Sequence, residues 1–309
     1  MTLMLHELGY RVIVLDNLST GFENAVIGAE FICGDIHDSE KLDEVFNKYN
    51  IDVVMHFAAH IDVGESVCDP FKYYRNNVVG TQTLLERMVS NQVDNFIFSS
   101  TAAIFGEPEY VPIDEMHVKK PINPYGHSKR MVEQMLESYD QAYGLKSVCL
   151  RYFNAAGADP KTRIGERHDP ETHLIPLVLQ AASGRRESIS VFGNDYETED
   201  GTCIRDYIHI VDLCDAHLLA TEFLLKENTS QRFNLGNGNG YSVKQLIDIA
   251  KKITNKPIKV NQDDRRAGDP AKLVADAALA KKILNWKPQY SHLDEIIEHA
   301  WKWELKQSS

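Results

Sequence analysis

Short, nearly continuous apolar runs alternate with longer amphipathic stretches in the first half of the chain. Strands that are covered on both faces are apolar throughout, whereas surface helices repeat their apolar positions every three to four residues. The predicted buried strands are Arg11–Asp16, Glu30–Cys33, Val53–Phe57, Phe96–Ser99 and Val148–Tyr152. The predicted helices between them are Ser39–Lys48, Phe71–Val89 and Tyr125–Tyr143. This alternation predicts an α/β fold with a doubly wound parallel sheet, which is Rossmann-like.

The pattern changes after Gly157, where a loop-rich region begins at Ala158 and runs to Thr172. Beyond it we predict one short strand at Ser190–Phe192 and several helices. These helices are Pro176–Ser183, Leu213–Leu225, Val243–Ile253, Asp276–Leu284 and Leu293–Trp303. We therefore predict a Rossmann-like domain over residues 1–155, to which residues 204–235 return. Residues 156–309 are predicted to form a smaller C-terminal α/β lobe.

The start of the chain departs from the usual pattern of a nucleotide-binding sheet. Such sheets begin with a strand, a glycine-rich turn and a helix whose N-terminus holds a pyrophosphate. Here the first residues resemble the end of that helix, with apolar Leu3, Leu5 and Leu8 followed by Gly9. We therefore expect the sheet to lack its first strand and glycine-rich loop. A late start codon, a cut or a shortened protein would each explain this, and we expect weak dinucleotide binding and marginal folding of the chain as written.

Charge and composition exclude several classes of partner. The 33 Lys and Arg residues against 45 Asp and Glu give a net charge of -12, which opposes binding to nucleic acid or to an anionic membrane. No apolar run reaches the ~20 residues that span a bilayer, and no secretion signal opens the sequence, so we expect a cytoplasmic protein. Five cysteines without a C-x-x-C pair suggest neither a disulfide framework nor a thiolate zinc site, and we expect most of them to be buried.

Tyr125 and Lys129 form a Tyr-x-x-x-Lys pair at the start of a predicted helix. Residues four apart lie on the same face of a helix. A phenol beside an ammonium ion ionises below its reference pKa of about 10, so the pair predicts a general base near neutral pH. His56 and His60 also lie four apart, but they flank a strand end. We interpret them as structural histidines and expect no metal site.

Further polar and small residues follow the predicted strands, at the edge where parallel sheets bind ligands. They are Asp16, Asp35, Phe57 to Ala59, Ser99 to Thr101 and Asn154. An acidic residue after a strand, as at Asp16, commonly binds the ribose 2′-hydroxyl of a dinucleotide and favours NAD over NADP. The sequence thus predicts a single crevice that holds both the chemistry and a cofactor.

Several strings of residues, in order along almost the whole chain, resemble the UDP-glucose (or UDP-galactose) 4-epimerases of the extended short-chain dehydrogenase/reductase family. They include LDNLSTG (Leu15–Gly21), SSTAAIFG (Ser99–Gly106), PYGHSK (Pro124–Lys129), RYFNAAGA (Arg151–Ala158), HLIP (His173–Pro176), RDYIH (Arg205–His209) and RRAGDPA (Arg265–Ala271). The combination of RDYIH with RRAGDPA is more specific than the other strings. The resemblance implies an isomerase of carbohydrate metabolism that interconverts UDP-glucose and UDP-galactose with bound NAD.

The resemblance also implies roles for individual residues. Tyr125 would take the proton of the sugar 4-hydroxyl, Lys129 would hold the nicotinamide ribose, and Thr101 would bind the same sugar oxygen. The neighbouring Ala102 and Ala103 stand where related dehydratases carry an acidic pair, so elimination of water is not expected. The implied product is inverted at C4 after a 4-keto intermediate.

The remaining implied contacts divide between cofactor and substrate. For the cofactor they are Asp16, Asn17, Ser19, Asp35, Ile36, Phe57, Ala58, Ala59, Asn76, Asn77 and Tyr152, with Thr101, Tyr125 and Lys129. For the UDP-sugar they are Asn154, His173, Leu174, Arg205, Arg265 and Asp269. Members of this family also lead us to expect a homodimer.

Two other functions stay open on the sequence alone. One is a related nucleotide-sugar epimerase that acts on UDP-N-acetylhexosamines or uronates, and Leu273, at a position that tunes pocket width, does not decide this. The other is a truncated, non-catalytic binder of sugar nucleotides, because the glycine-rich loop is not found.

Overall fold

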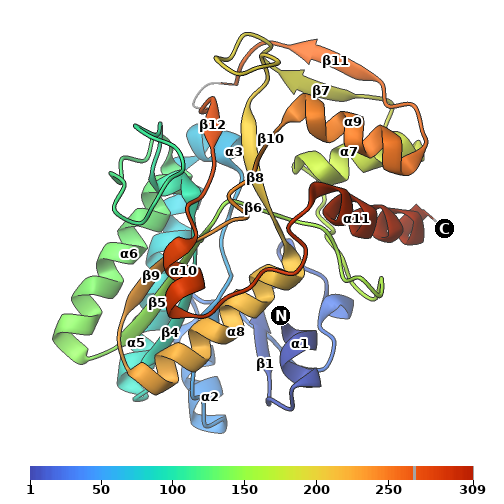
Figure 1. Cartoon of the computed structure of the whole chain (residues 1–309). Coiled ribbons are helices and arrows are strands. Elements are labelled where there is room, and N and C mark those ends of the chain that lie inside the picture. The colour runs from blue at the N-terminus through green and yellow to red at the C-terminus, as the bar shows by residue number, and fades with distance from the viewer. Residues whose placement is uncertain (267–268, 309) are drawn as a thin grey trace. The chain divides into compact units, whose positions relative to one another are not determined.

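The computed structural model describes residues 1–266 and 269–308, and it divides into two compact units. The first unit contains residues 1–106, 119–151 and 216–233, and the second contains residues 107–118, 152–215 and 234–309. Figure 1 labels the elements of both. Three separate segments therefore form each unit, and each unit is described below by itself.

The first unit has the predicted alternation of strands and helices. Its elements are α1 (Thr2–Glu7), β1 (Ile13–Asp16), η1 (Glu23–Ala25), β2 (Glu30–Cys33), α2 (Ser39–Lys48), β3 (Val54–His56), α3 (Val63–Cys68), α4 (Pro70–Tyr73), η2 (Tyr74–Gly80), α5 (Thr81–Ser90), β4 (Asn95–Thr101), η3 (Ala102–Ile104), α6 (Pro124–Tyr143), and most of β5 (Lys146–Tyr152), α8 (Ile210–Glu227) and β9 (Gln231–Leu235). The predicted helix Phe71–Val89 is a helical run that includes the π-helical turn η2. The prediction of an α/β fold with parallel strands is confirmed.

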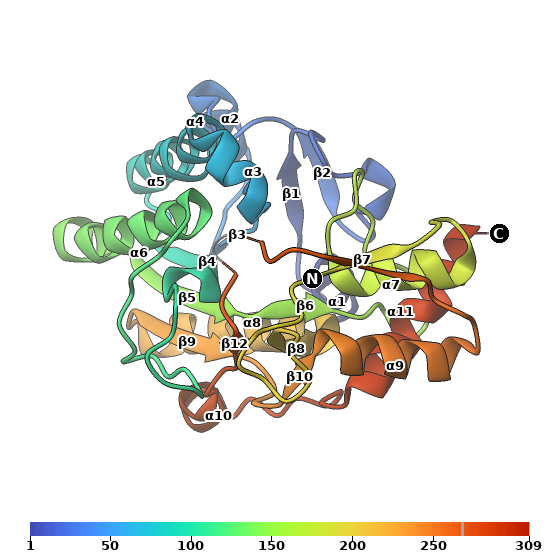
Figure 2. The same cartoon turned by 90° about the horizontal axis from the view of Figure 1, so that it is seen from above.

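The strands of the first unit form two separate sheets among the described residues. One sheet has the order β1-β2 and the other the order β3-β4-β5-β9, as Figure 2 shows from above. Pairing is parallel between β1 and β2 and between β3 and β4. No described strand joins β1 to β3.

An apolar core holds the helices of the first unit against the larger sheet. Buried side chains from α2, α5, β4, α6 and β5 form one cluster, which includes Leu42, Leu85, Phe96, Leu136 and Cys149. Helices α5 and α6 lie on the same face of the sheet (Figure 2). Of the five cysteines, however, Cys149 and Cys203 are buried while Cys33 and Cys68 are exposed, so the expectation that most are buried was wrong.

A buried ion pair ties α6 to two strands of this sheet. Arg151 of β5 donates from Nε and Nη2 to the two carboxylate oxygens of Glu133 on α6, at 2.9 and 2.7 Å. Ser100 of β4 donates to the same carboxylate at 2.7 Å. Glu133 and Arg151 are 0% and 1% exposed. Burial opposes ionisation, but the hydrogen bonds and charge of Arg151 hold the pKa of Glu133 below its usual value.

The second unit contains two small sheets and several helices around a core of its own. Its elements are β6 (Asn154–Ala156), α7 (Leu174–Ser183), β7 (Ile189–Phe192), β8 (Ile204–His209), β10 (Gly240–Ser242), α9 (Val243–Thr254), β11 (Val260–Asp263), β12 (Lys272–Leu273), α10 (Ala278–Ile283) and α11 (Leu293–Ser308). Strand β8 lies between β10 and β12 and also pairs with β6, while β7 pairs with β11. Most of these short strands were not predicted.

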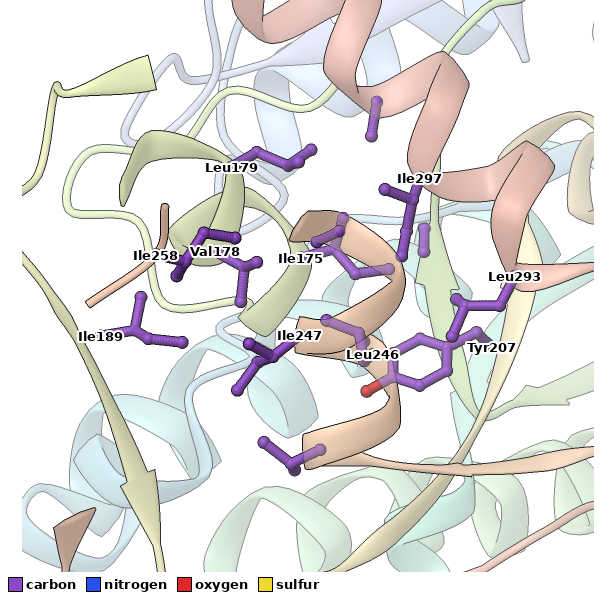
Figure 3. Packing of buried hydrophobic residues seen from close by; sticks show 14 of the residues in the cluster. Ile175, Val178, Leu179, Ile189, Tyr207, Leu246, Ile247, Ile258, Leu293 and Ile297 are labelled. Carbon is purple, nitrogen blue, oxygen red and sulfur yellow. The ribbon is translucent and has the colours of Figure 1, made fainter. Parts of the chain in front are cut away.

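Helices α7, α9 and α11 supply much of the apolar core of the second unit, as Figure 3 shows. Ile175, Leu246 and Ile297 come from the three helices, and Tyr207 joins them from β8. Helix α9 begins at a capping box, in which Ser242 and Gln245 bond reciprocally to backbone N–H groups. None of the helices in the described ranges is long and apolar enough to cross a membrane.

We expect Glu133→Gln to lower the free energy of unfolding by about 3–5 kcal/mol, because it leaves the Arg151 charge buried without its counter-ion. The matched control is Glu137→Gln, one turn further along α6, which removes a partly exposed pair with Arg232 and should cost less than about 1 kcal/mol. Urea unfolding midpoints of the two variants provide the comparison. Equal losses of unfolding free energy in the two variants would show that the buried pair stabilises the fold no more than the partly exposed pair does.

Candidate active site

Helix α6 carries Tyr125 and Lys129 one turn apart. The helix begins at Pro124, and the side chain of its N-cap residue, Asn123, accepts a hydrogen bond from Gly126 N at 2.8 Å. Proline at the first position and asparagine at the cap both favour a helix start here. Thr101 ends β4 in the same unit, and its Oγ1 accepts a hydrogen bond from Ala103 N at 3.1 Å.

Gly126 allows the start of α6 to approach the turn that follows Thr101. A Cβ atom at Gly126 would lie 2.5 Å from the carbonyl oxygen of Ala103, which is closer than real Cβ contacts. Any larger residue would therefore push the helix start away from this turn. The sequence analysis did not single out Gly126, although a glycine next to the tyrosine in a first helical turn was a usable signal.

The ammonium group of Lys129 is buried beneath the helix. Its Nζ donates to the carbonyl oxygen of Ser99 at 2.9 Å and lies 4.9 Å from the ring centroid of Phe98. Burial without a carboxylate partner lowers the pKa of Lys129 to about 7. The pKa of His56 is lowered to about 3, mainly by burial and in part by the positive charge of Lys129. His56 is therefore neutral, and its Nε2 lies 2.8 Å from Thr81 Oγ1 in the core.

Asn77 connects the candidate catalytic helix to the loop after β3. Its amide group bonds to both the N–H and the carbonyl oxygen of His60 and donates to Ser128 Oγ at 3.1 Å. Asn76 in turn donates to Asn77 Oδ1. Asn77 is 2% exposed. These contacts give Asn77 a positioning role, which the sequence analysis did not foresee.

The candidate residues at the ends of β1 and β2 lie together. Asn17 donates to Asp35 Oδ2 at 2.7 Å, Asp16 Oδ1 accepts from Leu18 N, and Asn17 Oδ1 accepts from Ser19 N. Burial opposes ionisation of Asp35, but hydrogen bonds from His37 and Asn17 lower its pKa. These groups can accept hydrogen bonds from ribose hydroxyls and an adenine amino group. A set of carboxylate and amide oxygens that accept hydrogen bonds fits the ribose hydroxyls of NAD better than a 2′-phosphate.

Two neighbours complete this end of the first unit. His37 Nδ1 lies 2.7 Å from Asp35 Oδ1, and its Nε2 lies 3.0 Å from the carbonyl oxygen of Arg75. Ile36 lies against Gly80, where a Cβ atom would come within 2.7 Å of Ile36 Cδ1. Sequence reasoning missed His37, although the acidic residue two positions earlier was a signal for such a pair.

The segment after β3 presents small and aromatic groups at the surface of the first unit. Phe57 is 46% exposed, and its ring centroid lies 5.0 Å from that of His217. Ala58 is exposed and Ala59 half-buried. Such groups leave room for a ligand but provide no charge. Tyr152, the last residue of β5, is half-buried and belongs to the second unit.

In the second unit, the structure pairs two of the candidate substrate residues. Arg205 of β8 donates to Asp269 Oδ1 at 2.5 Å and to the carbonyl oxygen of Ile204 at 2.9 Å. Asn154 of β6 donates to the carbonyl oxygen of Asp206 in the paired strand β8. The proximity of Arg205 and Asp269, which are 64 residues apart, could not be read from the sequence.

Arg265 pairs with a different carboxylate, that of Asp195. Its Nε donates to Asp195 at 2.6 Å, and its guanidinium stacks 4.2 Å from the ring centroid of Tyr196. The side chain is 46% exposed, so it remains accessible to a ligand. The motif RRAGDPA includes Ala267 and Gly268, which lie outside the described residues.

His173 and Leu174 mark the start of α7, as N-cap and first residue. His173 Nδ1 lies 2.7 Å from Glu166 Oε1 and 3.2 Å from Glu171 Oε1. Burial favours the neutral imidazole, but the two carboxylates outweigh it and raise the pKa of His173 to about 10. Sequence reasoning missed both glutamates.

The protein-family model "NAD dependent epimerase/dehydratase family" matches residues 1–236. The chain belongs to this family. It is 53% identical to a UDP-glucose 4-epimerase of Halalkalibacterium halodurans, over 97% of this chain and 90% of that protein. It is 50% identical to a UDP-glucose 4-epimerase of Rhizobium meliloti, over 99% of this chain and 93% of that protein. The resemblance noted in the sequence is thereby confirmed.

Solved structures of family members share the fold. The UDP-glucose 4-epimerase of Brucella ovis in complex with NAD has a TM-score of 0.95 at 49% identity and covers 97% of this chain and 93% of its own. The UDP-glucose 4-epimerase of Bifidobacterium longum in complex with NAD+ and UDP has a TM-score of 0.95 at 36% identity, over 99% and 94% of the two chains. The Rossmann-like assignment is therefore shown by structure as well as by sequence.

The buried Lys129 gives the stability of the protein a particular pH dependence. Because its pKa is lowered in the folded state, the unfolded chain binds more protons between about pH 7 and pH 10.5, and stability rises with pH in that window. The difference in unfolding free energy between wild type and Lys129→Met should therefore shift in favour of wild type by up to about 1.4 kcal/mol per pH unit. Urea unfolding of both proteins at pH 7 and pH 9 measures this shift. A difference in unfolding free energy that is the same at both pH values would contradict the lowered pKa of Lys129.

Proposed function

We propose that this chain is an NAD-dependent epimerase that interconverts UDP-glucose and UDP-galactose through a 4-keto intermediate. The observation that carries the proposal is the placement of Tyr125 and Lys129 on one face of α6, in the same unit as Thr101. The family assignment and relatives about 50% identical over nearly the whole chain support it.

In the proposed reaction, Tyr125 accepts the proton of the sugar 4-hydroxyl while Thr101 donates a hydrogen bond to the same oxygen. Bound NAD would supply a reversible acceptor for the C4 hydride, so that return of the hydride to the other face of the sugar would invert C4 without net oxidation. Lys129 lies one turn from Tyr125 and, when protonated, favours the phenolate by its charge. Its buried amine would hold the nicotinamide ribose.

The residues after Thr101 limit the reaction to epimerisation. Ala102 and Ala103 form the turn η3, and neither can donate or accept a proton through its side chain. Elimination of water from a sugar requires an acid near the leaving hydroxyl. Without one at these positions, return of the hydride is the available route for the intermediate.

On the cofactor side, we propose that Asp16, Asn17, Ser19, Asp35 and Ile36 hold the adenosine end. Phe57, Ala58 and Ala59 are assigned to the pyrophosphate side, and Asn76 or Asn77 and Tyr152 to the remaining contacts. The hydrogen-bonded group formed by Asn17 and Asp35 supports the first assignment most directly.

On the substrate side, Arg205 and Arg265 are proposed to bind the diphosphate, Asp269 the uridine ribose, and Asn154, His173 and Leu174 the rest of the UDP-sugar. A guanidinium carries five N–H donors, so Arg205 can keep its bonds to Asp269 and Ile204 and still donate to a phosphate. Two arginines explain how a chain of net charge -12 binds an anionic ligand.

We further propose a cytoplasmic homodimer. The cysteines form no disulfide among the described residues, which suits a reducing compartment. The dimer rests on the resemblance to family members, and sedimentation analysis of the purified protein tests it. A monomer at micromolar concentration would contradict it.

Tyr125→Phe should lower the conversion of UDP-galactose to UDP-glucose by about 10²–10⁴-fold, because it removes the general base. UDP binding, measured by calorimetry, should change less than about twofold. The matched control is Tyr139→Phe on the same helix, which should retain activity. A Tyr125→Phe variant as active as the control would refute the mechanism, and inactive wild-type protein that binds UDP would favour the non-catalytic binder.

A second substrate class is supported by one relative. The UDP-Glc/GlcNAc 4-epimerase of Campylobacter jejuni has a TM-score of 0.83 at 41% identity. The same assay with UDP-N-acetylgalactosamine distinguishes a broad from a narrow pocket. We expect Leu273→Ala to raise the ratio of N-acetylated to plain sugar turnover if Leu273 limits the pocket.

A further inference from the structure

Four ionisable side chains converge in the loop before α7, within eight consecutive residues of the second unit. They are Glu166, His168, Glu171 and His173, and one candidate ligand atom from each lies within 4.8 Å of all the others. Glu166, His168 and Glu171 line a pocket together with Trp303 and Glu304 of α11. Two imidazoles and two carboxylates are a common set of zinc ligands.

The four histidine–carboxylate distances range from 2.7 to 3.7 Å, on both sides of the edge length of a zinc coordination tetrahedron. His173 Nδ1 lies 2.7 Å from Glu166 and 3.2 Å from Glu171, while His168 Nδ1 lies 3.4 and 3.7 Å from the same two carboxylates. Zinc bonds of about 2.0–2.2 Å in tetrahedral geometry place neighbouring ligands about 3.3–3.5 Å apart. The four separations scatter around this value.

Surrounding contacts fix the backbone that carries the four ligands. The carbonyl oxygen of Glu166 accepts a hydrogen bond from Trp303 Nε1 at 2.8 Å, and a Cβ atom at Gly165 would collide with the Trp303 ring at 2.3 Å. Glu171 Oε1 accepts backbone N–H groups from Thr172 and His173. His168 Nδ1 is buried and has no hydrogen bond of normal length in the structure. It therefore points to the carboxylates at a distance that suits a shared cation better than a direct bond.

We propose that Glu166, His168, Glu171 and His173 form a structural zinc site, with the two histidines binding through Nδ1. Four protein ligands close the coordination shell, which is typical of a structural rather than a catalytic zinc. Without metal, two imidazolium groups and two carboxylates have no net charge. With Zn²⁺ and neutral imidazoles the sum is again zero, so the metal replaces two protons.

A metal bound at this site would fix the position of the loop at the start of α7. His173 is the N-cap residue of this helix, and its side chain makes no capping hydrogen bond. The metal would fix His173 and join the loop to the helix start, in a segment that already bonds to α11 through Glu166. No catalytic candidate belongs to the site, although His173 is also a proposed contact to the UDP-sugar.

The test is zinc binding by tag-free full-length protein after treatment with EDTA and removal of the chelator. Calorimetry with ZnCl₂ should give one site per chain with micromolar or tighter affinity, and Mg²⁺ at the same concentration should give none. His168→Gln and Glu171→Gln should each weaken zinc binding at least 100-fold. His292→Gln, which changes an exposed histidine elsewhere in the second unit, should leave it unchanged.

A background without the two exposed cysteines and a second measurement separate this site from other causes of zinc binding. The exposed Cys33 and Cys68 are replaced by serine in every variant, so that thiolates do not supply the signal. Co²⁺ in place of zinc should give the strong visible absorption of tetrahedral coordination, and this absorption should vanish in Glu171→Gln even if the melting temperature of that variant falls. Absence of zinc binding, binding that survives both substitutions, or a weak octahedral spectrum would each overturn the proposal.

Discussion

The buried ion pair between Glu133 and Arg151 governs the geometry of the first unit. It joins α6 to β5, and through Ser100 it also joins the helix to β4. Two charges taken out of water are stable only when their hydrogen bonds are well matched, so the pair permits little sliding or rotation of the helix. Because Tyr125, Lys129 and Glu133 occupy successive turns of α6, the pair also sets where the proposed base and its lysine lie relative to Thr101 at the end of β4. The apolar cluster beneath the helix holds it against the sheet, but apolar contacts alone tolerate small shifts.

Much of this arrangement could be predicted because it depends on residues near one another in the sequence. The alternation of apolar strands with amphipathic helices predicted the parallel order, and the Tyr-x-x-x-Lys spacing predicted that Tyr125 and Lys129 share a helix face. The ends of β1 and β2 were predicted to meet, and Asn17 and Asp35 do so. What could not be predicted depends on contacts between distant residues. Gly126 is required by the carbonyl group of Ala103, and Arg205 pairs with Asp269 across 64 positions.

The separation of β1-β2 from β3-β4-β5-β9 has a physical meaning for the cofactor. In a doubly wound sheet the crevice at the switch in strand order holds the dinucleotide. The residues proposed for the adenosine end follow β1 and β2, and those proposed for the nicotinamide end lie at β4 and α6. Among the described strands, β1 and β2 form one sheet and β4 belongs to the other.

The spacing of Tyr125, Lys129 and Glu133 along α6 also limits how this region can change during evolution. Each residue added to or removed from a helix rotates everything beyond it by about 100°. An insertion or deletion between Tyr125 and Glu133 would therefore turn either the phenol or the carboxylate away from its partners, whereas a substitution at an exposed position such as Met131 would leave both in place. The segment can therefore vary in residue type at exposed positions, but not in length. Among divergent relatives that keep the same chemistry, we expect these nine positions to align without gaps.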